Sequence, residues 1–411
     1  MVAIGRFGSL FFSLGTVPAI ARALGPEGRG TSAALLAVVA IGTVALGLGV
    51  PLAVRRLVSA GEHRPNVMTT GRLYAFLMTI PAVALSVPVY FLMFSGLTQG
   101  EAVAFFISMA CIPLSISWAM DVSVLVSTRE YRRIAVLGLI QAGSYFSIIV
   151  AGWLTDSLTI ASVLYAQLAG NLLSFLVGLF WVSARGGKVV GFALLVREGA
   201  SLAGGQLADI ASRRLDQVIV LPLLGAGGAG LYSVAVTVGS LPVPVAQAVG
   251  VAAFNGLAQA EDDDRFEIKR VLRYSSLLGL FSAVPLAVAS YFLIPIVFGS
   301  EFSDAVPVAM VAIIGSIFGV VGFNCSMALA AKKRGRELTT VQLVGLGFSV
   351  LLIFPLSLWF GPVGTAVSTA LGTFLTMSLT MWRLGVRPRD AVPLLSDVSG
   401  VITMMTRSGR I

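Results

Sequence analysis

The chain has few of the residues on which most soluble enzymes depend. Charged residues make up 11% of its 411 positions, whereas about a quarter is typical of a soluble domain. It contains one histidine, His63, and two cysteines, Cys111 and Cys325, so we predict no histidine-based catalytic centre, no CxxC motif and no metal site. Both cysteines fall inside apolar stretches and are interpreted as small buried residues. The absence of a GxxxxGK[ST] loop argues against ATP hydrolysis by that route.

Hydrophobic residues instead account for 57% of the chain, and the mean hydropathy is +0.93. A helix needs about 20 apolar residues to cross a bilayer. The sequence contains twelve apolar spans of about that length or more, at residues 2–21, 31–53, 73–95, 102–127, 134–154, 159–183, 199–224, 231–256, 274–297, 304–331, 338–360 and 363–382. We therefore predict an all-α polytopic membrane protein with about 12 transmembrane helices.

The net charge of +9 is distributed unevenly among the loops. Of the 28 Lys and Arg residues, 23 lie in the tail and in the loops that follow even-numbered spans, and only Arg22 and Arg29 lie in the opposite loops. Cytoplasmic loops of membrane proteins carry such an excess of basic residues. We therefore expect a multi-pass protein of the cytoplasmic membrane with both termini in the cytoplasm. On this interpretation the positive charge is a topology signal, and no nucleic-acid partner is predicted.

An internal repeat divides the chain into two halves. LGPEGRG at 24–30 and LGAGGAG at 224–230 match at one Leu and three Gly, and each precedes a long apolar span. The repeat argues that the first span is a retained helix, although Ala19-Ile20-Ala21 mimics a signal-peptidase site. It predicts four segments: an N-terminal six-helix bundle at 1–184, a cytoplasmic linker at 185–198, a C-terminal six-helix bundle at 199–383 and a cytoplasmic tail at 384–411.

One span, at 199–224, contains the sequence GQLADIASRRLDQVIV. At 100° per residue, Gln206, Asp209, Arg213 and Asp216 fall within an arc of roughly 80° and form a polar stripe. A charge that faces lipid at mid-helix costs about 2.5–3.5 kcal/mol, so the stripe is expected to face protein or water. Two interpretations stay open. The charges either pair along their own helix and fix its packing, or they line a binding cavity.

Arg214 does not belong to this stripe, because it lies about 100° around the helix from Arg213 with only Gln217 one turn away. A guanidinium offers fixed donors and keeps its charge when buried, so an unpaired one suits a pyrophosphate. Arg6, in the first span, is expected either to reach the cytoplasmic interface or to reach the cavity. The candidate cavity residues are therefore Arg214, Arg213, Asp216, Asp209, Gln206 and Arg6, with no catalytic or metal-binding residue among them.

Several stretches resemble the polysaccharide flippases of the multidrug/oligosaccharidyl-lipid/polysaccharide (MOP) exporter superfamily. The run ARALGPEGRGTSAALLAVVAIGTVALGLGVPLAVRR at 21–56 is similar to the first helical hairpin of that family. RRLDQVIVLPLLGAGGAGLYSVAV at 213–236 resembles its Asp-bearing span 7, glycine turn and start of span 8, and two later turns, at 294–305 and 360–372, are also similar. The resemblance implies two pseudo-symmetric six-helix bundles, as in MATE and MOP transporters, around a cavity that opens alternately to each side.

The resemblance further implies a flippase, not an enzyme, that moves a polyprenyl-pyrophosphate-linked oligosaccharide across the cytoplasmic membrane for surface polysaccharide synthesis. No cofactor is implied, and coupling to an H⁺ or Na⁺ gradient stays open. The implied partners are the lipid-linked glycan, the bilayer, and the glycosyltransferases and polymerase of the glycan pathway. The alternatives are a cation-coupled MATE-type multidrug exporter, which would call for an acidic cavity, a lipid II-type flippase, which generally has more spans, and a membrane-embedded glycan polymerase, which usually needs a sizeable outer loop.

Overall fold

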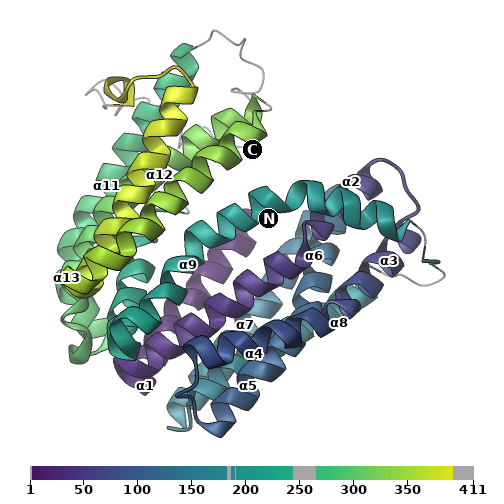
Figure 1. The fold of residues 1–411 in the computed structure, drawn as a ribbon, viewed down its shortest axis with the longest axis horizontal. Helices are drawn as coiled ribbons and strands as arrows, with labels where there is room; N and C mark the ends of the chain where they lie inside the picture. Colours follow the sequence, from purple (N-terminus) through teal and green to yellow (C-terminus); the bar gives the residue numbers. More distant parts are fainter. Residues whose placement is uncertain (1, 183–186, 190, 244–264, 333, 392–411) are drawn as a thin grey trace. The chain divides into compact units, whose positions relative to one another are not determined.

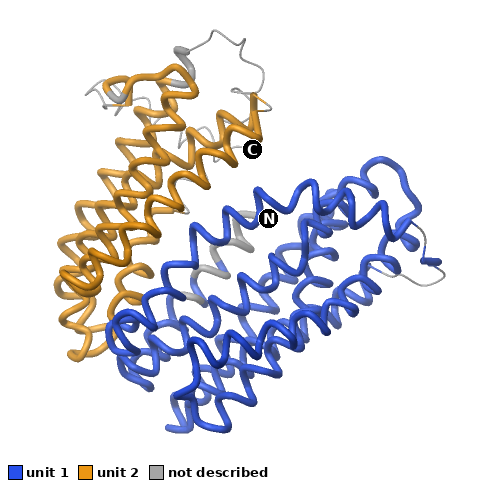
Figure 2. Tube along the Cα trace, in the orientation of Figure 1, with its two compact units in different colours: residues 1–230 blue, residues 231–411 orange. Residues whose placement is uncertain are grey.

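The structure, a computed structural model, consists of helices and their connections throughout the residues that it describes (Figure 1), which are 2–182, 187–189, 191–243, 265–332 and 334–391. The chain divides by its internal contacts into two compact units, residues 1–230 and 231–411 (Figure 2). Unit 1 thus contains the six N-terminal predicted spans and also the seventh. The division into bundles at 1–184 and 199–383 stays a prediction.

Nine helices in the described part of the chain are long and apolar enough to cross a membrane. Three of them are too long for one crossing, since α1 (Val2–Gly47), α9 (Phe192–Gly239) and α13 (Gly335–Arg383) have 46, 48 and 49 residues and about 20 suffice. Each of the three is interrupted by one glycine with a positive φ: Gly25, Gly225 and Gly361. Each therefore accounts for two predicted spans, and the all-α fold with about twelve spans is confirmed.

The interrupting glycines explain where these long helices turn. Gly25 has φ 63° and Gly361 has φ 58°, a region that glycine adopts without a steric penalty, and each precedes a proline, which is suited to the first turn of a new helix. In α13 the chain folds back on itself, because the hydroxyl groups of Ser357 and Thr365, on either side of Gly361, are 2.7 Å apart. The Gly-Pro pairs are therefore turns of helical hairpins.

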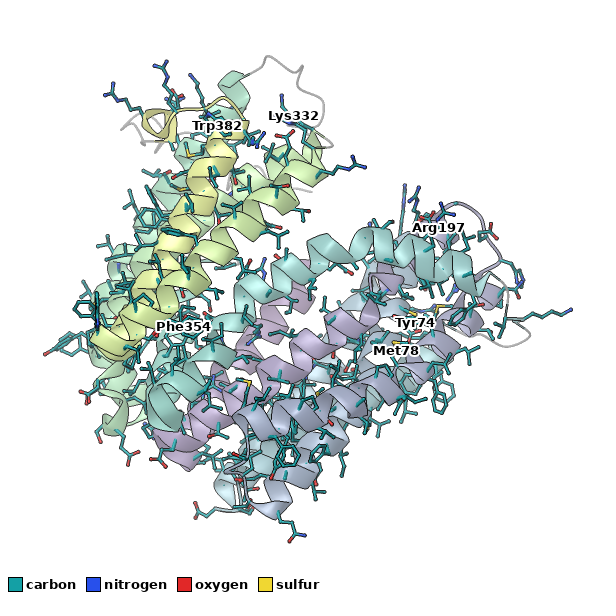
Figure 3. The ribbon with its side chains drawn as sticks, viewed as in Figure 1. Tyr74, Met78, Arg197, Lys332, Phe354 and Trp382 are labelled. Carbon is teal, nitrogen blue, oxygen red and sulfur yellow. The ribbon has the colours of Figure 1, made fainter. Side chains whose placement is uncertain are left out.

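Unit 1 contains α1, the first part of α9 and seven helices between them: α2 (Val50–Ser59), α3 (Arg64–Leu77), α4 (Thr79–Met93), α5 (Gln99–Ala110), α6 (Ile112–Ser127), α7 (Tyr131–Leu154) and α8 (Ile160–Trp181). The pairs α3–α4 and α5–α6 each form one candidate span. Side chains from different spans meet in its interior, where the hydroxyl of Tyr74 (Figure 3) donates a hydrogen bond of 2.7 Å to the carbonyl oxygen of Leu46.

A buried ion pair ties α3 to α6 in this unit. Nη2 of Arg72 lies 3.0 Å from Oδ1 of Asp121, whose side chain has no exposed surface. The same Nη2 donates to the carbonyl oxygen of Val182 at 2.9 Å, and Arg64 donates to that of Trp181 at 3.2 Å. The last carbonyl groups of a helix have no partner within it. The two arginines therefore satisfy the end of α8 while one of them neutralises Asp121.

Unit 2 contains the end of α9 followed by α11 (Arg265–Phe298), η1 (Ser300–Phe302), α12 (Ala305–Ala331), α13 and η2 (Pro388–Ala391). Lys332 and Trp382 lie at one end of the unit and Phe354 at the other (Figure 3). Arg334, the residue before α13, joins the two ends of α13 at the first end of the unit, because its Nη1 donates to the carbonyl oxygen of Arg383 at 2.9 Å. The core of the unit here is apolar and includes Cys325.

Asp390, beyond the last candidate span, holds the segment after α13 against α11. Its Oδ2 accepts a hydrogen bond of 3.0 Å from the backbone N–H of Arg387, and its Oδ1 lies 3.1 Å from Nζ of Lys269. The backbone hydrogen bond, and then the lysine, hold the pKa of the Asp390 carboxyl below its usual value. The carboxylate is therefore ionised throughout the neutral and mildly acidic range.

Candidate functional site

The polar stripe of α9 contains one of the ion pairs that its spacing predicts. Nε of Arg213 donates to both carboxylate oxygens of Asp209 at 3.1 Å, one helical turn away. The two side chains keep 46% and 52% of their surface exposed. Arg213 is therefore neutralised by its own helix, and a salt bridge this exposed adds little to stability.

Asp216 is in a different environment from the exposed pair, although it lies on the same face of the helix. It is 8% exposed, and its Oδ1 accepts a hydrogen bond of 2.8 Å from the backbone N–H of Gln217. The reason is its place along α9: Val218, Val220 and Leu221 are buried beside it, whereas the helix is more open around Asp209. Gln206, the first residue of the stripe, is half-buried.

Arg214 is exposed. Its Nη1 lies 3.4 Å from Oε1 of Gln217, a long hydrogen bond to a neutral group. Asp216 and Arg213 both lie close enough to interact electrostatically with Arg214. Asp216 attracts the guanidinium of Arg214 but also accepts a hydrogen bond from a backbone N–H, and Arg213 repels that guanidinium. Arg214 thus presents its guanidinium without a salt bridge to any described carboxylate.

Arg6 is the candidate that the structure leaves open. Its backbone belongs to α1, but its side chain lies outside the described residues. Its assignment to the cavity stays a prediction. The roles of Arg214, Arg213, Asp216, Asp209 and Gln206 in binding a substrate are likewise predictions that the geometry does not test.

Arg29 is a cationic residue that sequence reasoning missed. We expected it in an outer loop, but the turn is confined to Gly25, and α1 resumes at Pro26. Arg29 therefore lies in the first turn of the resumed helix and is only 8% exposed. Tyr145 of α7 and Arg214 of α9 are near enough to interact with it electrostatically. The available signal was its position next to Gly30, because a glycine on a helix surface lets another backbone approach closely.

The two copies of the glycine repeat touch each other in the structure. A Cβ added to Gly30 would lie 2.0 Å from the carbonyl oxygen of Ala226, and a Cβ added to Gly230 would lie 1.9 Å from that of Pro26. The two contacts are equivalent under the repeat offset, since Pro26 corresponds to Ala226. Only glycine allows the backbones of α1 and α9 to approach so closely.

A second glycine contact joins α9 to the connection between α1 and α2. Gly49 has φ 68°, and a Cβ there would lie 2.3 Å from the carbonyl oxygen of Gly199. Beside it, Nη1 of Arg56 lies 2.8 Å from Oε2 of Glu198. The part of α9 that carries the charges is thus held at one end against α1 and at the other against the α1–α2 connection and α2. Arg213 and Arg214 lie between the two contacts.

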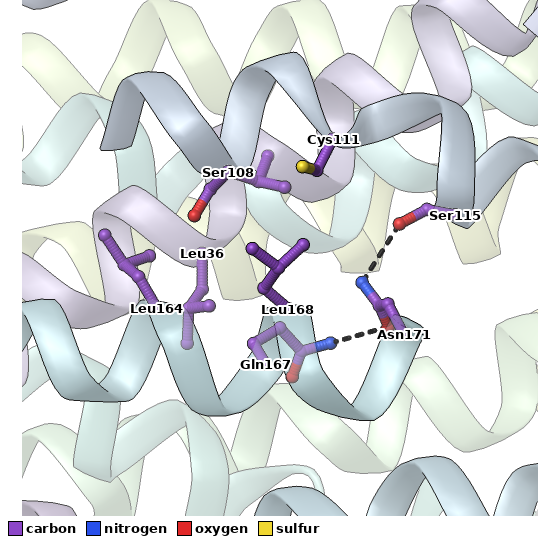
Figure 4. Close-up of a pocket in the computed structure, with 9 residues that line it drawn as sticks. Leu36, Ser108, Cys111, Ser115, Leu164, Gln167, Leu168 and Asn171 are labelled. Carbon is purple, nitrogen blue, oxygen red and sulfur yellow. Dashed lines mark hydrogen bonds between the residues drawn. The ribbon is translucent and has the colours of Figure 1, made fainter. Parts of the chain in front are cut away.

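A narrow pocket lies inside unit 1, away from these charges (Figure 4). Three of the polar side chains that line it, those of Ser115, Gln167 and Asn171, bind one another. Asn171 donates to Oγ of Ser115 at 3.0 Å and accepts from Gln167 at 3.4 Å. Since no charged residue lines it, we assign this pocket to helix packing in unit 1. Among the described residues, no three His, Cys, Asp or Glu side chains are grouped to hold a metal ion.

Comparison with known sequences gives one family. Residues 19–307, well over half of the chain, match the family described as "Polysaccharide biosynthesis protein". The lipopolysaccharide biosynthesis protein WzxC of Escherichia coli (strain K12) is 24% identical over 184 residues, which cover 44% of this chain and 37% of WzxC. The match thus spans little more than a third of that relative's length.

Solved structures share the fold along nearly the whole chain. The lipid II flippase MurJ in its inward closed conformation has a TM-score of 0.79 at 13% identity, with 98% of this chain and 91% of that chain covered. A multidrug resistance MATE family transporter of the MOP superfamily, in its inward-facing conformation, has a TM-score of 0.70 at 13% identity, with 92% and 94% covered. At these identities the likeness concerns the fold, which is the MOP transporter fold that the sequence predicted.

Proposed function

This chain belongs to the polysaccharide biosynthesis protein family, and we propose that it is a flippase for an oligosaccharide linked to a polyprenyl pyrophosphate. On this proposal it moves the lipid-linked glycan from the cytoplasmic to the outer leaflet of the cell membrane by alternating access. The family match and the MOP transporter fold support this kind of function. Coupling to an H⁺ or Na⁺ gradient, and cooperation with glycosyltransferases and a polymerase, form part of the proposal.

The observation that carries the proposal is the contrast between two neighbouring arginines. Arg213 is neutralised by Asp209, whereas Arg214 is exposed and has only a long hydrogen bond to Gln217. A charged group within an apolar span is costly, and such residues usually serve a substrate or ion pathway. Of the two arginines, Arg214 is the one with donors available for a pyrophosphate, which binds a guanidinium in a bidentate way.

This contrast also separates the flippase from a cation exporter of the same fold. An exporter of cationic drugs calls for a net negative cavity. Along the described part of α9, the charges at Asp209 and Arg213 cancel, and Arg214 adds a positive charge near the buried Asp216. Arg29 adds another positive charge near the same place. The local balance therefore favours an anionic substrate.

The test is glycan export by variants in a strain that lacks the gene. We expect Arg214→Ala to abolish surface polysaccharide while the protein level in the membrane stays normal. Arg214→Lys should recover only part of the export, because an ammonium group lacks the bidentate donor geometry. Gln217→Ala is the matched control, since it removes the one hydrogen-bond partner that Arg214 has among the described residues and keeps the charge.

The neighbouring arginine gives the second arm of the experiment. Arg213→Ala breaks an exposed pair, so it should lower stability by no more than about 1 kcal/mol and leave most of the export intact. Normal polysaccharide from well-expressed Arg214→Ala would refute the role of Arg214. Unchanged polysaccharide after deletion of the whole gene, with no other flippase expressed, would refute the function itself.

A further inference from the structure

Arg29 is buried in a way that its own protein does not compensate. Its residue is 8% exposed, and Nε is buried without a hydrogen-bond partner. No described carboxylate forms a salt bridge with its guanidinium. Taking a charged group out of water without a partner costs several kcal/mol, which is why buried charges in proteins are normally paired. The burial of Arg29 therefore calls for an anion that the described part of the chain does not supply.

The surroundings of Arg29 increase this cost. Arg214 lies close enough to repel it. Arg29 also lies in the first turn of the helix that resumes at Pro26, where the helix dipole is positive and disfavours a cation. The nearest acidic residue along the chain, Glu27, is exposed and lies about 200° around the helix. The charge of Arg214 and the helix dipole would instead stabilise a bound anion.

Tyr145 adds a hydrogen-bond donor at the same place. It is half-buried against an apolar cluster that includes Ala19 and Ile20 of α1 and is near enough to both Arg29 and Arg214 to interact with their charges. A phenol and two guanidinium groups offer only N–H and O–H donors to an anion with several oxygens. Phosphate groups are bound by such sets of donors.

We propose that Arg29, Tyr145 and Arg214 form an anion-binding site that takes a phosphate group of the transported substrate. The inference rests on the proposed function for the identity of the substrate. The site lies beside the contact of Gly30 with Ala226 and close to the turn at Gly25. The charge distribution predicts that this turn is on the outer side. Of the two arginines, Arg29 is thus the one nearer the predicted outer face. It stays without a partner until the phosphate arrives.

The test uses the full chain in nanodiscs of uncharged lipid, with thermal unfolding measured with and without inorganic pyrophosphate or a polyprenyl pyrophosphate. Arg29→Met removes the charge and keeps the length of the side chain, Arg29→Lys keeps the charge, and Arg22→Met changes an exposed arginine near the same turn as the matched control. Sodium chloride at equal ionic strength controls for screening.

We expect pyrophosphate to raise the unfolding temperature of the natural protein and of Arg22→Met but not of Arg29→Met. Without pyrophosphate, Arg29→Met should be at least as stable to heat as the natural protein, because it removes an uncompensated charge. Arg29→Lys should bind with affinity reduced at least tenfold. Lower stability of Arg29→Met without ligand would overturn the inference, because it would mean that the protein itself holds the charge. If pyrophosphate raises the unfolding temperature of Arg29→Met as much as that of the natural protein, the inference is overturned as well.

Polysaccharide export distinguishes this inference from the proposed function. Arg29→Met should lower surface polysaccharide at least tenfold at equal protein level. If the natural gene restores export and Arg29→Met restores it equally, the site is refuted and the flippase function stands. If pyrophosphate binding depends on Arg29 but deletion of the gene leaves surface polysaccharide unchanged, the anion site stands and the proposed function is refuted. A response to the polyprenyl pyrophosphate alone would identify the lipid-linked form as the ligand rather than free pyrophosphate.

Discussion

The contact between the two glycine repeats gives a prediction whose size and sign follow from the structure. Alanine at position 30 would put Cβ 2.0 Å from the carbonyl oxygen of Ala226, and alanine at position 230 would put it 1.9 Å from that of Pro26. Cβ atoms essentially never approach within 3.0 Å of another heavy atom, so each contact is short by at least 1 Å. The opposing atoms belong to the backbone and cannot rotate away. The two helices must therefore separate.

The free energy of unfolding should fall in both variants. Forcing extra atoms into a packed interface costs about 1–3 kcal/mol. Replacing glycine by alanine within a helix recovers roughly 0.5–1 kcal/mol. From the middle of each range, we therefore expect Gly30→Ala and Gly230→Ala each to lower the free energy of unfolding by about 1 kcal/mol. The double variant should cost less than the two singles together, because helices that have separated for one methyl group have room for the other.

Gly204→Ala is the matched control. Gly204 lies in α9, and an added Cβ would meet nothing within 4 Å. Only the gain in helix propensity remains, so this variant should be more stable than the natural protein by up to about 1 kcal/mol. Replacing glycine by alanine is thus expected to raise the free energy of unfolding at position 204 of α9 and to lower it at position 230 of the same helix.

The native cysteines provide the assay, since opening of the fold raises the rate at which a thiol-reactive fluorophore labels the half-buried Cys111 and the buried Cys325. Cys111 belongs to unit 1 and Cys325, which has no exposed surface, to unit 2. The glycine contact lies in unit 1, so the measurement is made on Cys111 in a Cys325→Ala background. Gly30→Ala with the stability of the natural protein would refute the reasoning. If the double variant loses as much free energy of unfolding as the two single variants together, the two glycines do not share one contact.

Three further outcomes are expected. Arg72→Ala should lower the free energy of unfolding of unit 1 by about 3–5 kcal/mol, because it leaves the carboxylate of Asp121 buried and unpaired. A second change in the same chain, Asp121→Asn, should recover much of this loss. Thiol labelling measures the stability of both variants. Because the pKa of Asp390 is lowered in the folded protein, its stabilising contacts are complete above the ordinary carboxyl pKa of about 3.9 and are lost as pH falls through the lowered value. The difference in unfolding temperature between the natural protein and Asp390→Asn should therefore persist at pH 5 and vanish only in stronger acid. Cysteine labelling in intact cells should find both the 61–66 loop and the 384–411 tail on the cytoplasmic side, and labelling of either from outside would contradict the predicted topology.

The fold could be predicted from the sequence because a bilayer imposes local rules. Each crossing needs a long apolar run, so the spans could be read along the chain one at a time. The turns of α1 and α13 could be read as well, since Gly25 and Gly361 each precede a proline and glycine alone adopts such a φ freely. The pairing of Asp209 with Arg213 is equally local, because residues four apart meet on one helix whatever surrounds it.

The tertiary structure decided which of the charges are buried and which are paired. Asp209 and Asp216 lie on one face of α9, yet only Asp216 is buried, because the helix packs more closely along that part of its length. The partner of Asp121 is Arg72, which is distant in sequence and becomes a neighbour only when α3 packs on α6. No periodicity along one segment contains that information.

Arg29 shows the same limit at the candidate site. The sequence by itself determined that a basic residue stands between two glycines of the repeat. It did not determine whether the charged side chain would be buried or exposed. Its burial depends on α1 and α9 meeting through Gly30 and Gly230, which lie 200 positions apart under the repeat offset. Burial is a property of the packed surfaces of both helices, and it raises the free-energy cost of the charge from near zero in water to several kcal/mol without a partner.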